Sequence, residues 1–117
     1  MDFPKQENDK PLKLIPYESD IRKRCDNLMK KRGAYICPVN QDERGSSGAP
    51  DRVYCYKGMF IAVEYKRSAS EKASRLQLHH KDMIRSAGGK WYLIWSSEQL
   101  ELEMHILEGT INAEKKK

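Results

Sequence analysis

The sequence has no apolar run long enough to cross a membrane or to form the core of a secretion signal. We therefore expect the protein to remain in the cytoplasm in which it is made. Cysteine is also scarce, because the chain has three cysteines and no CxxC pair. This pattern favours neither a disulfide framework nor a zinc site, and we expect Cys25, Cys37 and Cys55 to be buried free thiols.

A chain of 117 residues has room for one domain with a single modest core. We expect residues 1–16, with three prolines, to be a flexible lead-in, residues 17–111 to form the domain, and residues 112–117 to be a basic tail. The net charge of +5 favours a polyanionic partner, although a basic surface also serves solubility.

Two segments in the middle of the chain predict a β-hairpin. Residues 51–56 and 59–66 are rich in aromatic and β-branched side chains, and the Lys57-Gly58 pair between them is typical of a tight turn. A two-residue loop would pair Tyr56 with Met59 and fix the register of the whole hairpin. A three-residue loop would shift that register by one and send alternate side chains to the opposite face.

The two-residue loop gathers three charged side chains at the open end of the hairpin. Asp51 then lies directly opposite Glu64, and Lys66 points to the same side because side chains alternate along a strand. Two carboxylates so close repel each other unless a proton or a cation lies between them, and hard oxygen ligands favour Mg2+ or Mn2+. A Glu-x-Lys is usually a solvated surface, but this hairpin has apolar residues on both faces, where unused charges are costly.

Helices and further strands are predicted on both sides of the hairpin. Apolar residues recur at helical spacing over residues 17–32 and 71–87, and Ser96 begins a capping-box pattern for a last helix. Short apolar runs predict strands over residues 34–39 and 91–95, the second at the centre of the sheet. The order αβββαβα predicts an α/β fold with a mixed four-stranded sheet between helices.

The predicted helix 71–87, with Ser70 as its cap, has two distinct stripes. The inward stripe is expected to consist of Leu76, Met83, Ile84 and Ala87. An adjoining stripe carries Gln77 and Lys81. From there Gln77 can reach the sheet end that holds the acids, although an exposed glutamine on the surface is the more ordinary arrangement.

Three further charged residues have both a functional and an ordinary interpretation. Glu18, at the start of the first helix, is either a helix-terminal acid or a metal ligand. Arg44 and Arg52 flank the acids and either contact phosphates or are simply exposed.

The last helix has two apolar residues, Leu102 and Ile106, on a separate face. They mark a candidate partner surface.

Gly48-Ala49-Pro50-Asp51, followed by Glu64-Tyr65-Lys66 and then Gln77, resembles the virus-type replication-repair nuclease (VRR-NUC) branch of the PD-(D/E)xK nucleases, in its stand-alone, phage-like form. The resemblance spans roughly residues 18–97. It implies a restriction-endonuclease-like core in which Asp51 and Glu64 bind the metal and Lys66 is catalytic, with Glu18 and Gln77 completing the site. Tyr65 departs from the hydrophobic residue usual at its position.

The resemblance and the charge together predict a Mg2+- or Mn2+-dependent deoxyribonuclease that hydrolyses phosphodiester bonds. It implies a homodimer acting on branched DNA such as Holliday junctions, in a bacterial or phage-infected cytoplasm. Arg44, Arg52 and Lys81 are the candidate DNA contacts. The alternatives are a nicking or flap-type repair nuclease, a non-catalytic nucleic-acid-binding module, and a structural protein whose acids and lysine form a surface ion-pair cluster.

Overall fold

The structure is a computed structural model that describes residues 18–39 and 48–115. Arg44, and the predicted lead-in up to residue 16, lie outside the described residues. Within the described part of the chain, the elements follow the predicted order αβββαβα. They are α1 (Glu18–Lys31), β1 (Tyr35–Cys37), β2 (Arg52–Tyr56), β3 (Met59–Tyr65), α3 (Arg75–Ser86), β4 (Lys90–Ile94) and α4 (Ser97–Lys115).

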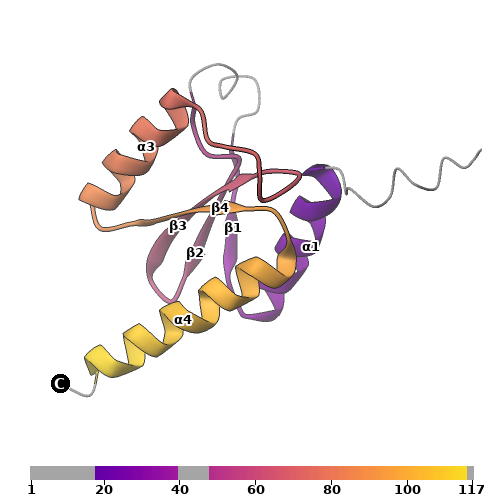
Figure 1. The fold of residues 1–117 in the computed structure, drawn as a ribbon. Coiled ribbons are helices and arrows are strands. Elements are labelled where there is room, and N and C mark those ends of the chain that lie inside the picture. Colours follow the sequence, from indigo (N-terminus) through magenta and orange to yellow (C-terminus); the bar gives the residue numbers. More distant parts are fainter. Residues whose placement is uncertain (1–17, 40–47, 116–117) are drawn as a thin grey trace, which may run out of the picture.

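The described strands form one mixed sheet in the order β1-β2-β3-β4. β1, β2 and β3 pair antiparallel, whereas β3 and β4 run parallel. The parallel pair is possible because α3 carries the chain back across one face of the sheet between them, as Figure 1 shows. This arrangement confirms the predicted mixed α/β fold. The prediction that residues 91–95 form a central strand is wrong, because β4 lies at the edge of the sheet.

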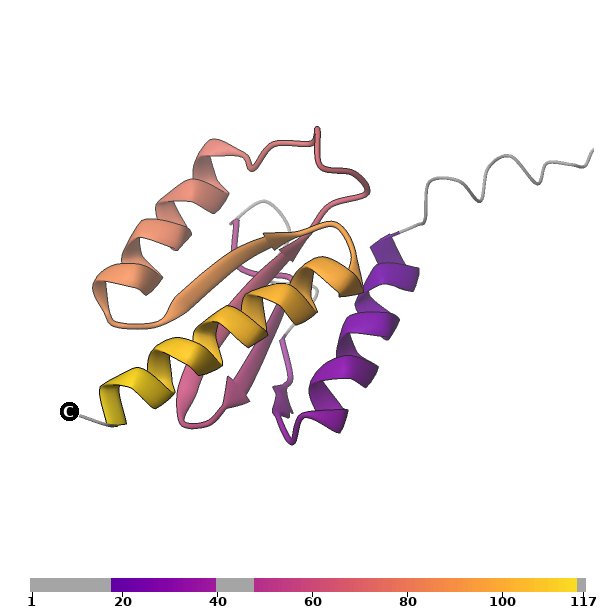
Figure 2. The same cartoon turned by 60° about the horizontal axis from the view of Figure 1, so that its bottom comes forward.

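The two faces of the sheet are covered unequally. α1 and α4 cross one face, and α3 lies over the other (Figures 1 and 2). The main core lies on the α1 and α4 side, where the buried side chains come from both helices and three strands. Its members are Ile21, Cys25, Met29, Tyr54, Tyr56, Ile61, Val63, Tyr65, Ile94, Leu100, Met104 and Leu107.

The hairpin of β2 and β3 has the predicted two-residue loop. Tyr56 pairs with Met59, and the ladder continues to the pair of Arg52 with Val63. Lys57 and Gly58 both have positive φ, at 53° and 80°, which is the backbone twist that a tight hairpin turn requires. Since the register is unshifted, the next pair along the ladder brings Asp51 across from Glu64.

α3 begins later than predicted and has no buried face. It starts at Arg75 with Ser74 as its N-cap, not at residue 71 with Ser70 as the cap. No residue of α3 is buried, and two of the apolar residues expected to face inward are more than half exposed, Leu76 at 51% and Met83 at 58%. The adjoining stripe that carries Gln77 and Lys81 faces the sheet instead.

The other predicted helices have their expected buried faces. In α1, Ile21, Cys25 and Met29 are buried, and α4 buries Leu100 and Met104. α4 continues to Lys115, so most of the expected tail at residues 112–117 is helical.

The cysteines only partly follow the prediction. All three are free thiols, but Cys37 is half-buried and Cys55 is exposed, so that Cys25 alone is buried. Burial raises the pKa of the Cys25 thiol to about 12, which keeps it protonated at neutral pH.

Among the described helices, none is long and apolar enough to cross a membrane.

Candidate active site

The two predicted acids lie at the end of the β2–β3 ladder and are removed from solvent. Asp51 is 8% exposed and Glu64 is 1% exposed. The backbone N–H of Tyr65 donates a hydrogen bond of 2.9 Å to Asp51 Oδ2, which holds this carboxylate against the last residues of β3. Buried carboxylates are costly unless they are paired or used, so their burial at the end of adjacent strands needs a physical reason.

Gln77 connects the predicted acid and the predicted lysine. Its Nε2 donates a hydrogen bond of 3.0 Å to Glu64 Oε1. Its Oε1 accepts two hydrogen bonds, one of 3.3 Å from Lys66 Nζ and one of 2.8 Å from the backbone N–H of Ser74. The first turn of α3 therefore places one amide between the carboxylate and the ammonium of the Glu-x-Lys pair.

The donor set fits a hard divalent cation. Asp51 and Glu64 provide carboxylate oxygens, and Gln77 connects Glu64 to the Lys66 ammonium. Mg2+ is typically held by one or two carboxylates together with waters and phosphate oxygens of a substrate, so two acids are enough for such a site. Within the part of the chain that the structure describes, no three His, Cys, Asp or Glu side chains group closely enough to hold a metal. Glu18, the first residue of α1, is thus not brought into one cluster with the other two acids.

Comparisons with known proteins address the fold. No protein-family model matches the sequence, and no curated protein matches it. One solved structure, described as a VRR_NUC domain, superimposes with a TM-score of 0.65 and covers 75% of this chain and 94% of that chain, at 22% sequence identity. The chain has the VRR_NUC fold. At this identity the similarity establishes the architecture, and the chemistry must be argued from the side chains.

Arg52 has a partner on the opposite face of the VRR_NUC sheet from the acids. Its guanidinium forms two hydrogen bonds with Asp26 of α1, from Nε at 3.1 Å and from Nη2 at 2.7 Å. Burial alone would lower the pKa of Arg52, but the hydrogen bonds and the charge of Asp26 outweigh burial and raise it. Arg52 was expected as a candidate phosphate contact. In the structure it forms an ion pair with Asp26 instead, and only 18% of its side chain is exposed.

Asp26 also begins a chain of hydrogen bonds that leads to the Glu-x-Lys motif. The Tyr54 hydroxyl donates to Asp26 Oδ1 at 2.6 Å and lies 2.8 Å from the Tyr65 hydroxyl. Because the Tyr54 proton points to the carboxylate, the Tyr65 hydroxyl must donate to Tyr54. Tyr65 is the last residue of β3 and lies between Glu64 and Lys66, so this chain of hydrogen bonds anchors the end of the strand that carries Glu64 and leads into Lys66. Sequence reasoning missed Asp26, whose only signal was its place beside the buried stripe of α1.

The buried hydroxyls of Tyr54 and Tyr65 are poor acids. Burial raises the pKa of both tyrosines well above the ordinary value of 10. For Tyr54 the neighbouring Tyr65 and Asp26 act in the same direction as burial, and the hydrogen bond that Tyr54 donates to Asp26 favours the protonated hydroxyl. Both hydroxyls therefore stay protonated at neutral pH, and they serve as fixed hydrogen-bond groups rather than as proton-transfer groups.

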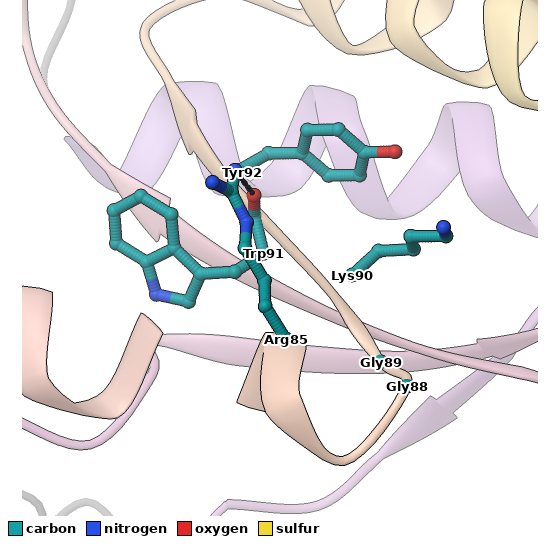
Figure 3. Close-up of a pocket in the computed structure, with 6 residues that line it drawn as sticks. All are labelled: Arg85, Gly88, Gly89, Lys90, Trp91 and Tyr92. Carbon is teal, nitrogen blue, oxygen red and sulfur yellow. Dashed lines mark hydrogen bonds between the residues drawn. The ribbon is translucent and has the colours of Figure 1, made fainter. Parts of the chain in front are cut away.

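Cationic side chains of α3 lie beside β4. Lys81 Nζ lies 5.9 Å from the centroid of the Trp91 ring. Arg85 donates a hydrogen bond of 3.0 Å to the Trp91 carbonyl and lines a hollow of about 360 Å³ with Lys90, as Figure 3 shows. The described residues lining this hollow include no carboxylate, so it does not compete with Asp51 and Glu64 as a metal site.

Proposed function

We propose that the protein is a Mg2+- or Mn2+-dependent deoxyribonuclease that hydrolyses phosphodiester bonds. The observation that carries the proposal is the contact of Gln77 with both Glu64 and Lys66, beside buried Asp51, in a chain with the VRR_NUC fold. Two carboxylates can hold a divalent cation, and a lysine beside them can stabilise negative charge, so the group suits metal-assisted hydrolysis of a phosphodiester. A surface ion-pair cluster would not need its acids to be buried.

Asp51 and Glu64 are the proposed metal ligands, and Glu18 is proposed as a third that would act through water or after a local movement. A bound divalent cation would polarise the scissile phosphate and lower the pKa of a water molecule at the site. The two carboxylates would hold such a cation in a fixed position, because the Tyr65 backbone and Gln77 each bind one carboxylate oxygen.

Lys66 supplies positive charge where negative charge develops. In the proposed reaction, the water oxygen bonds to phosphorus and releases one proton to solvent, while the opposite P–O bond breaks and the departing oxygen takes up one proton from solvent. The Lys66 ammonium, held by Gln77 Oε1, would orient the water and stabilise the pentacoordinate phosphate. Gln77 is a positioning residue in this scheme, since its amide contacts the two reactive side chains.

DNA is the proposed substrate, and its backbone would approach the face of the sheet that α3 partly covers. The chain carries a net charge of +5, and Lys81 lies on this face above Trp91. Arg44 stays a proposed contact outside the described residues. A contact from Arg52 would require its guanidinium to leave Asp26, so we assign DNA contact to Lys81 in preference.

Branched DNA and a homodimer form the finer part of the proposal. A symmetric four-way junction presents two equivalent strands, which two identical sites in a two-fold dimer would match. Leu102 and Ile106, four residues apart on α4, are 59% and 58% exposed and provide an apolar contact surface for a second copy.

A cleavage assay on matched substrates tests the proposal. Four-way junction, flap and linear duplex DNA of one sequence would be incubated with Mg2+, Mn2+, Ca2+ or EDTA. We expect cutting with Mg2+ or Mn2+ only, with the junction cut fastest. Preference for the flap would favour a repair nuclease instead. DNA binding without cutting in any metal would favour a non-catalytic module, and neither binding nor cutting would leave a structural protein.

A further inference from the structure

Gly48, the first residue of the Gly-Ala-Pro-Asp motif, packs directly against the first turn of α3. A Cβ atom built on Gly48 would lie 2.7 Å from the backbone carbon and the Cβ of Leu76, and 2.9 Å from the backbone nitrogen of Gln77. Carbon atoms do not approach so closely without a shift of the backbone. The loop before β2 and the start of α3 can therefore touch only if residue 48 has no side chain.

The conformation of Gly48 alone does not explain this contact. Gly48 has a φ of +78°, and Gly33, in the turn after α1, has a φ of +89°. An added Cβ would meet nothing within 4 Å at Gly33. The two glycines thus share the left-handed backbone that favours glycine, whereas only Gly48 of this pair also needs the space.

The turn that Gly48 touches is the turn that orients Gln77. Ser74 Oγ accepts a hydrogen bond of 3.1 Å from the backbone N–H of Gln77, and the backbone N–H of Ser74 donates to Gln77 Oε1 at 2.8 Å. This capping box directs the amide oxygen toward the helix start. The amide NH2 must then point the other way, where it meets Glu64 at 3.0 Å.

We propose that Gly48 is a positioning residue that sets the distance between Gln77 and the Glu64–Lys66 pair. The inference deepens the proposed nuclease function and rests on it. Any side chain at position 48 would push the first turn of α3 outward and lengthen the hydrogen bonds of Gln77. A misplacement of about 1 Å at a reacting group costs roughly 100-fold in rate. A displacement of Gln77 by only part of about 1 Å would therefore lower the cleavage rate measurably.

The test compares Gly48→Ala with Gly33→Ala as a matched control for backbone strain. Both variants place alanine at positive φ, but only Gly48→Ala also collides with α3. We expect Gly48→Ala to lower kcat about 10- to 100-fold, with KM and Ca2+-supported DNA binding within about 3-fold of the wild type. Gly33→Ala should keep kcat within about 2-fold. Equal rates for the two variants would overturn the proposal.

A double-mutant cycle shows whether Gly48 acts through Gln77. In a Gln77→Ala background, Gly48→Ala should cause little further loss of kcat, because the amide that it displaces is already gone. The same loss in both backgrounds would contradict the proposal. If Gly48→Ala does not fold, Ser74→Ala disturbs the same turn by removing its capping oxygen and is expected to show the same non-additivity.

A spectroscopic measurement separates this proposal from the nuclease function itself. The side-chain amide of Gln77 should give NMR signals shifted by its bond to buried Glu64. We expect those signals to move to ordinary glutamine positions in Gly48→Ala and to stay in place in Gly33→Ala. Unchanged Gln77 signals in Gly48→Ala would refute the positioning role whether or not the protein cuts DNA. A wild-type protein that never cuts would refute the nuclease function instead.

Discussion

At the scale of single residues, the site depends on the directionality of one amide. Gln77 has one acceptor and one donor end, and the structure uses both, with Lys66 and Ser74 at the oxygen and Glu64 at the NH2. Were the amide reversed, an NH2 would face the Lys66 ammonium and an oxygen would face a carboxylate. Electrostatics and the capping box therefore select the same orientation.

Lys66→Ala should lower the cleavage rate by two or more orders of magnitude, the scale typical of removing an electrostatic contact made in the transition state. DNA affinity should change little, because one phosphate contact is a small part of a large binding surface. Single-turnover rates and equilibrium binding in Ca2+ separate the two effects. If affinity falls and turnover survives, Lys66 anchors phosphate and has no role in the chemical step.

Alkaline pH should destabilise the fold through Tyr54 and Tyr65. Their pKa values are raised in the folded protein, so their contribution is complete below about pH 10 and is lost as pH rises toward the folded pKa values. Each tyrosine should contribute a slope of up to about 1.4 kcal/mol per pH unit above pH 10. Urea unfolding between pH 8 and pH 11 measures that slope.

Tyr54→Phe should reduce the slope by the share of one tyrosine. Tyr35→Phe provides the control, because Tyr35 is 64% exposed. A Tyr54→Phe protein with the wild-type slope would show that this hydroxyl is not held protonated by its surroundings.

At the scale of elements, α1 is fixed to the sheet by polar contacts as well as by its apolar stripe. Asp26→Ala should lower the free energy of unfolding by about 3 kcal/mol, because it leaves the Arg52 charge largely buried without its carboxylate. Asp20→Ala removes an exposed acid from the same helix and should cost less than about 1 kcal/mol. Urea denaturation compares the two variants, and equal losses would contradict a special role for Asp26.

The hairpin could be predicted from sequence because local chemistry determines it. The Lys57-Gly58 pair predicts the turn but allows a loop of two or three residues. The structure has the two-residue loop, and its register brings Asp51 across from Glu64. The start of α3 was harder to predict, because Ser70 and Ser74 are both suitable N-cap residues. The Ser74-to-Gln77 spacing of a capping box was present in the sequence and identifies the true start.

The edge position of β4 and the partner of Arg52 could not be read from the sequence. An apolar strand is expected wherever helices cover both faces, and α3 and α4 cover β4 although its outer side has no neighbouring strand among the described elements. Arg52 and Asp26 are far apart in sequence, and only the packing of α1 on the sheet brings them together. Such long-range pairing carries no local signal.

At the scale of the whole molecule, we predict a homodimer in solution. Light scattering should give a species near twice 13.6 kDa, and junction cleavage should give paired incisions at symmetry-related positions. Leu102→Glu with Ile106→Glu should yield a folded monomer, because both side chains are exposed. A wild-type monomer at micromolar concentration that makes single unpaired nicks would remove the resolvase proposal and leave the nuclease.

The proposed metal site is tested most directly by the Mg2+-dependent cleavage rates of Asp51→Asn and Glu64→Gln beside the wild type. Both substitutions keep side-chain size and a hydrogen-bonding oxygen for the Tyr65 N–H or Gln77, so the fold should be preserved. Loss of a carboxylate charge removes a metal ligand and relieves repulsion toward phosphate. We expect no detectable cutting by either variant, with DNA binding equal to or tighter than that of the wild type. Wild-type cleavage by either folded variant would contradict the proposed metal site.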